Sequence, residues 1–421
     1  MISKLKGLFQ NKNVLWNTAA GLINAAEAVI ILMVVSRTNG LEDSGIISLA
    51  FAIGNLMSTI GRFGMRNYQV TDVNNKYGFD TYFTSRIITV LIMGISSVIY
   101  MMFCYNNKGY DWYKISVILL ICLVYMVECL EDVFWGLYQR NGRLDLGGKI
   151  FFIRWFIHLA VICVMLIITH NIILSFIVGI VCGTVYTIIA NCIHFREFYQ
   201  GRLITNIGTF GVLKSCFPLF LAFFLTNYVT NSPKYAIDRY MDDSVQACYG
   251  YIAMPVFVIS LLNSFIYQPI LVEMANKWKR KKYGGFTRMI VKQMIILAML
   301  ILVVMIAGYI LGIPVLSWLY ATDLSAYKLE FMVLLFGGGL LAVAGFFGVV
   351  MTVMRIQLIN MYGYIIAAVM ALGLSGVFVK NWGVLGATIL YDVLLGAVSI
   401  IFAVFVTKWI RKKRLERKTI N

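Results

Sequence analysis

The chain has 421 residues, of which 60% are hydrophobic and only 13% are charged, and its mean hydropathy is +0.82. Soluble domains carry about 25% charged residues, so this composition excludes a soluble globular protein and predicts one embedded in a bilayer. The net charge of +17 would suggest nucleic-acid binding in a soluble protein. Here it is typical of basic loops that face an anionic leaflet, so no nucleic acid is expected as a partner.

Twelve apolar segments are long enough to cross a membrane. About 20 apolar residues span the hydrocarbon core of about 30 Å, and the segments do not alternate as barrel strands would, so helices are expected. In chain order they cover 14–36, 44–63, 82–104, 113–136, 150–169, 172–194, 212–231, 244–270, 290–318, 329–353, 357–379 and 384–407. The predicted fold class is an all-α polytopic membrane protein with twelve transmembrane helices.

The basic residues orient these helices. With a cytoplasmic N-terminus, only seven of the 36 Lys and Arg residues fall in predicted outer loops: Arg37, Lys108, Lys114, Lys234, Arg239, Lys328 and Lys380. Positive charge concentrates on the cytoplasmic side, so both termini are predicted to be cytoplasmic. The basic run KWKRKKYGG at 277–285 and the tail KWIRKKRLERK at 408–418 then lie on that side. We interpret both as topology determinants that touch lipid phosphates.

The second half of the sequence repeats features of the first. Asp43-Ser44 begins one apolar run and Asp243-Ser244 begins another, while FWGLYQRNGRLDL at 134–146 matches FFGVVMTVMRIQL at 346–358. These matches keep their order, which predicts a duplicated six-helix unit with lobes at 1–205 and 206–421, the second ending in the basic tail. Because six is even, a pseudo-twofold axis along the membrane normal is expected, with a cavity between the lobes.

Polar side chains in the first two helices recur at heptad-like spacing. Each charge at bilayer depth costs about 2.5–3.5 kcal/mol, so these positions are candidate functional residues. Those on a shared helix face are Asn17, Asn24 and Glu27 in the first helix and Ser48, Asn55 and Arg62 in the second. The two faces either line a wet cavity or pack against other helices. Glu27 is either a carboxylate that carries a coupling proton or one partner of a fixed ion pair.

Acidic residues cluster at the end of the fourth predicted helix. Glu128, Glu131 and Asp132 share one face there, and Arg154 lies at similar depth in the fifth helix. Two interpretations stay open: a structural ion-pair cluster and a mobile inner gate. Asp392 in the twelfth helix has no obvious partner in the sequence and is a further candidate for coupling or gating.

Five cations are candidate contacts for an anionic head group that passes through the membrane: Arg37, Arg62, Arg154, Lys214 and Arg239. Nucleotide-binding, metal-binding and nucleophile motifs are missing from the sequence. The eight cysteines form no Cys-x-x-Cys pair. We therefore predict a transporter and not an enzyme, with no catalytic residue, metal or cofactor, and with coupling to protons or sodium ions instead of ATP.

Several passages resemble Wzx-type polysaccharide flippases of the multidrug/oligosaccharidyl-lipid/polysaccharide exporter (MOP) superfamily. They are SRTNGLEDSGIISLAFAI, GLYQRNGRLDLGGK, TNSPKYAIDRYMDDSVQACYGYIAMP, YQPILVEMANKW and NWGVLGATILYDVL. The resemblance covers essentially the whole chain and implies twelve helices in two lobes. It also implies that an undecaprenyl-pyrophosphate-linked oligosaccharide moves from the inner to the outer leaflet of a bacterial cytoplasmic membrane for surface polysaccharide synthesis. The implied partners are this substrate and membrane lipids; whether a polysaccharide polymerase and a chain-length regulator join them stays open.

Three other functions remain as alternatives. A multidrug/cation antiporter of the same superfamily should have an acidic, aromatic cavity, and Glu27 and Asp392 keep it open. A lipid II flippase typically carries fourteen helices, whereas twelve are predicted here. A membrane-embedded glycan polymerase or ligase usually presents catalytic residues on a sizeable outer loop, and the longest outer loop predicted here is short.

Overall fold

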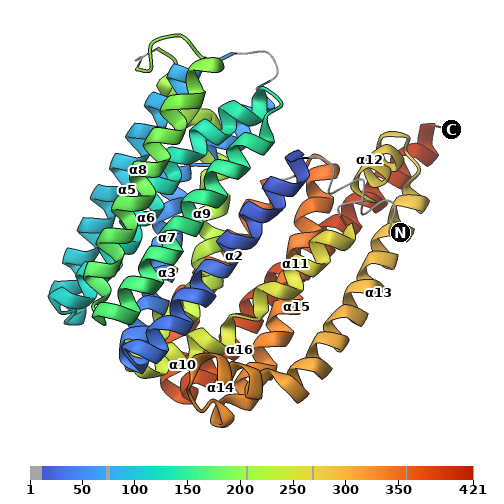
Figure 1. Cartoon of the computed structure of the whole chain (residues 1–421). Coiled ribbons are helices and arrows are strands. Elements are labelled where there is room, and N and C mark those ends of the chain that lie inside the picture. Colours follow the sequence, from blue (N-terminus) through green and yellow to red (C-terminus); the bar gives the residue numbers. More distant parts are fainter. Residues whose placement is uncertain (1–11, 73–75, 205–206, 268–269, 357, 421) are drawn as a thin grey trace. The chain divides into compact units, whose positions relative to one another are not determined.

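The computed structural model describes residues 12–72, 76–204, 207–267, 270–356 and 358–420. All regular structure in these ranges is helical, which confirms the predicted all-α class (Figure 1). Nine helical stretches among the described residues are long and apolar enough to cross a membrane. The chain is therefore a multi-pass membrane protein.

The chain divides into two compact units, Met1–Phe224 and Leu225–Asn421. The division lies inside one long helix, α9 (Thr209–Tyr240). The lobe boundary predicted from the repeat, at 205/206, falls on residues outside the described ranges.

The first unit contains one helix for each of the first six predicted segments. After α2 (Lys12–Thr38) come α3 (Leu41–Arg62), the short α4 (Met65–Thr71), α5 (Phe79–Lys108), α6 (Trp112–Arg140), α7 (Leu144–Thr169), α8 (Ile172–His194) and a short 3₁₀ turn, η1 (Phe195–Glu197). Local signals mark several helix starts. The side chain of Asp111 accepts a hydrogen bond from the Lys114 backbone at 2.9 Å, and Asn171 caps α8 in the same way through Leu174 at 3.0 Å.

Within this unit α3 packs against α5 and α6, while α2 packs along α7. The α2–α7 contact depends on Gly148, because a Cβ atom at this position would lie 2.9 Å from the backbone carbonyl of Trp16. Away from these contacts, large apolar side chains are exposed on the outer helices; Ile95 and Ile99 of α5 are 60% and 64% exposed. Such side chains suit contact with lipid.

The second unit follows the same order with more interruptions. It contains the end of α9, then α10 (Asp243–Ala253), α11 (Val256–Tyr267), α12 (Leu271–Lys279), α13 (Tyr283–Ala307), a π-helical turn η3 (Gly308–Gly312), α14 (Ile313–Tyr320), a 3₁₀ turn η4 (Ser325–Tyr327), α15 (Lys328–Val353) and α16 (Leu358–Ile420). Its main buried cluster is formed by side chains of α13, α15 and α16, with further contributions from α9 and α12.

Some predicted helices of this unit are not continuous. The segment 244–270 is broken between α10 and α11 at Pro255, which lacks a backbone donor and disfavours a helical residue before it. The segment 290–318 contains the π-helical turn η3, close to Pro314. Segments 357–379 and 384–407 run together as α16, in which Gly383 has non-helical dihedral angles of φ 55° and ψ −132°. Positions 268–269 and 357 of these predictions lie outside the described residues.

The predicted outer loop that holds Lys234 is helical in the structure. Helix α9 continues through Pro233 to Tyr240. A proline in a helix leaves the carbonyl four residues earlier without its usual donor, here that of Val229. The Ser232 hydroxyl donates to this carbonyl at 2.8 Å. Lys234 was therefore wrongly placed in a loop, because the sequence reading ended the helix where polar residues begin.

Candidate functional site

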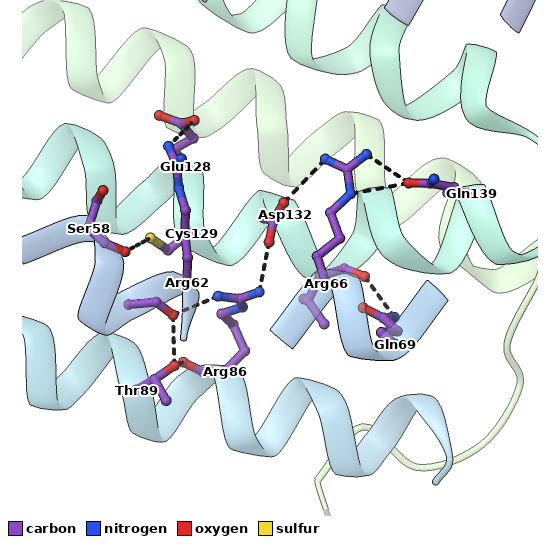
Figure 2. A network of polar contacts seen from close by, with 12 residues as sticks. Ser58, Arg62, Arg66, Gln69, Arg86, Thr89, Glu128, Cys129, Asp132 and Gln139 are labelled. Carbon is purple, nitrogen blue, oxygen red and sulfur yellow. Dashed lines mark hydrogen bonds and ion pairs between the residues drawn. The ribbon is translucent and has the colours of Figure 1, made fainter. Parts of the chain in front are cut away.

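Helix α6 carries the three acidic residues predicted to cluster, and each meets an arginine from another helix. Figure 2 shows the pairs of Glu128 and Asp132. Arg62, the last residue of α3, places its Nη2 atom 2.7 Å from Oε1 of Glu128. Arg62 keeps 41% of its side chain exposed, whereas Glu128 is buried. One turn further along α6, Asp132 binds two arginines that the sequence analysis did not select.

The first of these, Arg86 of α5, is completely buried. Its Nη2 lies 2.7 Å from Asp132, and its Nη1 donates to the carbonyl of Gly61 at 2.6 Å. The Gly61 carbonyl belongs to the last turn of α3, where carbonyl groups lack helical donors and a cation is favourable. Arg86 therefore holds the end of α3 while it positions Asp132.

The second, Arg66 of α4, contacts the opposite oxygen of Asp132 at 3.4 Å. Its guanidinium also donates to Gln139 at 2.9 Å (Figure 2). It lies 3.9 Å from the ring centre of Trp135. Arg66 follows Arg62 by one helical turn in the sequence, but nothing local indicates its partners. Its role emerges only when α4 packs on α6.

Glu131 and Arg154 form the most enclosed pair. Their charged atoms lie 2.5 Å apart, and the side chains are 3% and 2% exposed. The Arg154 guanidinium also lies over the rings of Trp155 and Phe151, at 4.4 and 5.1 Å from the ring centres. The contact is an ion pair by distance without hydrogen-bond geometry. The structure thus brings together the acidic cluster and Arg154; gating by these residues and substrate binding by Arg154 stay predictions.

Glu27 lies inside the same unit, on α2, with 4% of its surface exposed. The charges of Glu128, Arg154 and Arg62 act on its carboxylate. This helix therefore contributes a fourth acidic group to a region that already contains two arginine–glutamate pairs. Both interpretations of Glu27, a proton carrier and a structural charge, are compatible with this position.

The other predicted lining residues have different surroundings. Asn17 is exposed and Asn24 is partly buried on α2. Ser48 is completely buried on α3, and its hydroxyl has no hydrogen-bond partner within the part of the chain that the structure describes. Asn55 donates to the carbonyl of Phe51 at 3.0 Å and contacts the hydroxyl of Tyr125 at 3.3 Å.

Three of the predicted cations are exposed. Arg37 lies in the last turn of α2, Lys214 lies near the start of α9, and Arg239 lies near its end. The Arg239 guanidinium is 5.4 Å from the ring centre of Tyr240. Their contact with an anionic head group remains a prediction.

The second unit contains a polar pocket that the sequence analysis missed. It has a volume of about 190 Å³ and is lined by Lys234, Thr230 and Asn231 of α9, Tyr249 of α10 and Tyr391 of α16, together with apolar side chains. The ammonium group of Lys234 is partly buried and makes no ion pair or hydrogen bond with the other described side chains. An unpaired lysine in a transmembrane helix is a functional-site signal, but the assignment to a loop concealed it.

Asp392 follows Tyr391 on α16. Its Oδ1 atom is buried and has no hydrogen-bond partner among the described residues. Gly337 of α15 makes room for this carboxyl group, since a Cβ atom there would collide with it. In the described ranges no group of three or more His, Cys, Asp or Glu side chains could hold a metal ion.

Comparison with known proteins agrees with this architecture. No protein-family model matches the chain. The chain is 22% identical over 331 residues to the capsular polysaccharide biosynthesis protein CapF of Staphylococcus aureus, a match that covers 77% of this chain and 81% of CapF.

The fold is shared with solved structures, of which two are compared with this chain. The lipid II flippase MurJ, in an inward closed conformation, gives a TM-score of 0.73 at 12% identity and covers 96% of this chain and 90% of its own. An inward-facing multidrug resistance MATE family transporter of the MOP superfamily gives a TM-score of 0.68 at 12% identity. The match covers 94% of this chain and 95% of the transporter chain. In agreement with its sequence resemblance to Wzx-type flippases, the chain has the two-lobed helical fold of the MOP superfamily transporters.

Proposed function

We propose that this chain is a flippase that moves an undecaprenyl-pyrophosphate-linked oligosaccharide from the inner to the outer leaflet of a bacterial cytoplasmic membrane. The MOP fold supports transport, and the relative named for capsular polysaccharide biosynthesis supports a glycan as cargo. In this proposal both termini are cytoplasmic, and rocking of the two units is driven by a proton or sodium gradient without ATP.

The observation that carries the proposal is the pocket around Lys234. Its polar lining consists of an ammonium group, two tyrosine hydroxyls, a threonine hydroxyl and an amide, and it includes no carboxylate. Such a lining favours phosphate oxygens and sugar hydroxyls, which accept hydrogen bonds and, for phosphate, carry negative charge. In the first unit Arg62 is paired with Glu128 and keeps 41% of its side chain exposed, so its substrate contact remains part of the proposal.

A multidrug/cation antiporter is the second candidate, and Asp392 favours it. A buried carboxyl oxygen without a partner attracts a proton, a metal cation or an organic cation. In the pocket that Lys234 lines, its positive charge would repel an organic cation. The glycan polymerase or ligase is not supported, because the longest predicted outer loop, about Thr230 to Asp243, is largely helical in the structure.

Reconstitution in liposomes tests the choice between the two. Purified protein is placed in vesicles that contain an undecaprenyl-pyrophosphate-linked oligosaccharide, and a membrane-impermeant glycosidase reports the fraction that reaches the outer leaflet. We expect flipping without ATP that rises when a proton or sodium gradient is imposed. Gradient-driven accumulation of ethidium without oligosaccharide flipping would favour the antiporter and contradict the proposal.

A deletion strain tests the cargo in cells. Loss of this chain should cause a lipid-linked oligosaccharide to accumulate on the cytoplasmic side, where it stays inaccessible to reagents added from outside. A strain that also lacks its surface-polysaccharide polymerase should show the same intermediate if the chain acts before polymerisation. Unchanged lipid intermediates together with unchanged surface glycan would contradict the proposed function.

A further inference from the structure

A second cavity of the C-terminal unit plays no part in the proposed transport. It is a groove of about 710 Å³ between α13 and α16. Its apolar walls include Ile290, Met294, Ala298, Phe347, Val406 and Ile410. Val291 and Ile295 also line it and are each 51% exposed, so the groove is open at its side.

One end of this groove is basic. Arg411 and Arg414, on successive turns of α16, both line it. Arg414 is held in place across the groove, since its Nη2 donates to the Thr287 hydroxyl at 2.8 Å and to the Tyr283 carbonyl at 3.2 Å. Arg411 is exposed. An apolar groove with two guanidinium groups at one end is complementary to a molecule with an apolar chain and an anionic head group.

The dimensions fit one leaflet of a bilayer. On α13 the lining runs from Thr287 to Ala298, which corresponds to about 16 Å of helix. Half of a hydrocarbon core of about 30 Å has nearly the same depth. Two tryptophans lie at the basic end, Trp409 on α16 and Trp278 next to Tyr283, with ring centres of the latter pair 5.1 Å apart. Tryptophan is enriched at the head-group level of membranes, which places the arginines beside lipid phosphates.

We propose that this groove is a binding site for an anionic membrane phospholipid, with one acyl chain between α13 and α16 and the phosphate on Arg411 and Arg414. Planar guanidinium groups bind phosphate oxygens through paired N–H donors. The predicted cytoplasmic position of the tail places the site in the leaflet where anionic lipids attract basic segments. The bound lipid would fasten the end of α16 to α13.

Lipid titration of the purified full-length chain tests this site. The protein in detergent is mixed with phosphatidylglycerol or phosphatidylcholine, and native mass spectrometry measures the lipid retained. We expect phosphatidylglycerol to be retained about tenfold better, because its head group is anionic, whereas the choline of phosphatidylcholine neutralises the charge of its phosphate. The double variant Arg411→Gln/Arg414→Gln should lose this preference and the thermal stabilisation that phosphatidylglycerol gives.

A matched control removes the same charge outside the groove. Arg288 and Lys412 are exposed neighbours that do not line it, so Arg288→Gln/Lys412→Gln should keep the preference. Ala298→Phe, at the apolar end, should reduce retention while both arginines stay in place. Equal retention of the two lipids by the unmodified chain, equal loss in the control, or full retention by both groove variants would overturn the proposal. So would protection of the groove by a second copy of the chain, detected as a dimer that excludes added lipid.

Discussion

The two units have corresponding sequence features, but their charged side chains are paired differently. In the first unit α6 is joined to α3, α4, α5 and α7 through Glu128, Asp132 and Glu131 with their four arginines. In the described part of the second unit, the ion pairs join residues three or four apart on one helix, as in Lys277–Glu273 and Lys413–Glu416. Two partly buried charged residues of the second unit, Lys234 and Asp392, have no such partners among the described residues.

We interpret this difference as a division of roles between the two units. Ion pairs that link α6 to four other helices hold the first unit in one arrangement, and breaking the buried Glu131–Arg154 pair leaves an uncompensated charge. An unpaired lysine and an unpaired carboxyl group cost stability, so their presence in the second unit points to ligands or protons. The predictions below test whether the first set is structural and the second functional.

The largest effect on the free energy of unfolding is expected from breaking the Glu131–Arg154 pair. Arg154→Met or Glu131→Gln leaves one buried charge without its partner, which costs about 3–5 kcal/mol. The double variant Glu131→Leu/Arg154→Leu removes both charges and should recover most of the loss. Thermal unfolding in detergent, followed by tryptophan fluorescence, measures this effect. Arg143→Gln breaks an exposed pair with Asp145 and should cost below about 1 kcal/mol; equal losses at both sites would contradict a structural role for the buried pair.

The next effect is expected where α2 and α7 touch. Gly148→Ala puts a methyl group against the backbone of Trp16 and Asn17 and should cost about 1–3 kcal/mol. Gly21→Ala, in the same unit, meets nothing within 4 Å and should be neutral or slightly stabilising. The same unfolding assay compares the two variants. If they behave alike, close packing of α2 on α7 is not what holds the Glu27 helix in place.

Substitution of Lys234 should lower transport without lowering stability, in contrast to the substitutions in the first unit. Lys234→Met removes a partly buried cation that has no described partner, so protein levels and melting temperature should stay equal or rise. Export of the surface glycan should fall by about tenfold, which corresponds to about 1.4 kcal/mol. Immunoblots of surface glycan and of the membrane fraction measure both quantities in a complemented deletion strain. Retained export in Lys234→Met, with Lys234→Arg as the charge-conserving control, would remove this residue from the substrate path.

The smallest effect is expected for the contribution of Asp72 to stability, which depends on pH. Burial raises the pKa of Asp72, but this is outweighed by hydrogen bonds from the backbones of Lys76 and Tyr77 and from the Tyr82 hydroxyl, so the pKa lies below its ordinary value. Because the pKa of Asp72 is lower in the folded chain than in the unfolded chain, its carboxylate stabilises the fold at pH values above the unfolded-state pKa of about 3.9. This stabilisation is lost as the pH falls through the folded-state pKa. Asp72→Asn should therefore cost about 1 kcal/mol or less at pH 7. The difference in stability between this variant and the unmodified chain should vanish at acidic pH. A stability difference that does not change with pH would contradict the role assigned to the Asp72 carboxylate.

Sequence alone determined the all-α membrane class and the approximate positions of the helices. Apolar length and the cost of unsatisfied backbone groups in lipid leave few alternatives, so segments such as 82–104 and 172–194 match α5 and α8 closely. The acidic face of α6 was also readable, because Glu128, Glu131 and Asp132 follow helical periodicity. The same length criterion failed in two places. It ran the segment 244–270 through Pro255, where the structure separates α10 from α11. It ended another helix at 231, where polar residues begin, although the Ser232 hydroxyl helps to sustain α9 to Tyr240.

Only the tertiary structure decided which charges meet. Arg66 and Arg86 lie far from Asp132 in sequence, and no local periodicity encodes a contact between α4, α5 and α6. It also decided that Arg154 is enclosed beside Glu131 while Lys234, read as a loop residue, lines a pocket. The physical reason is that membrane insertion depends on the apolar content of each segment by itself, whereas the pairing of a charge depends on atoms brought together from several segments.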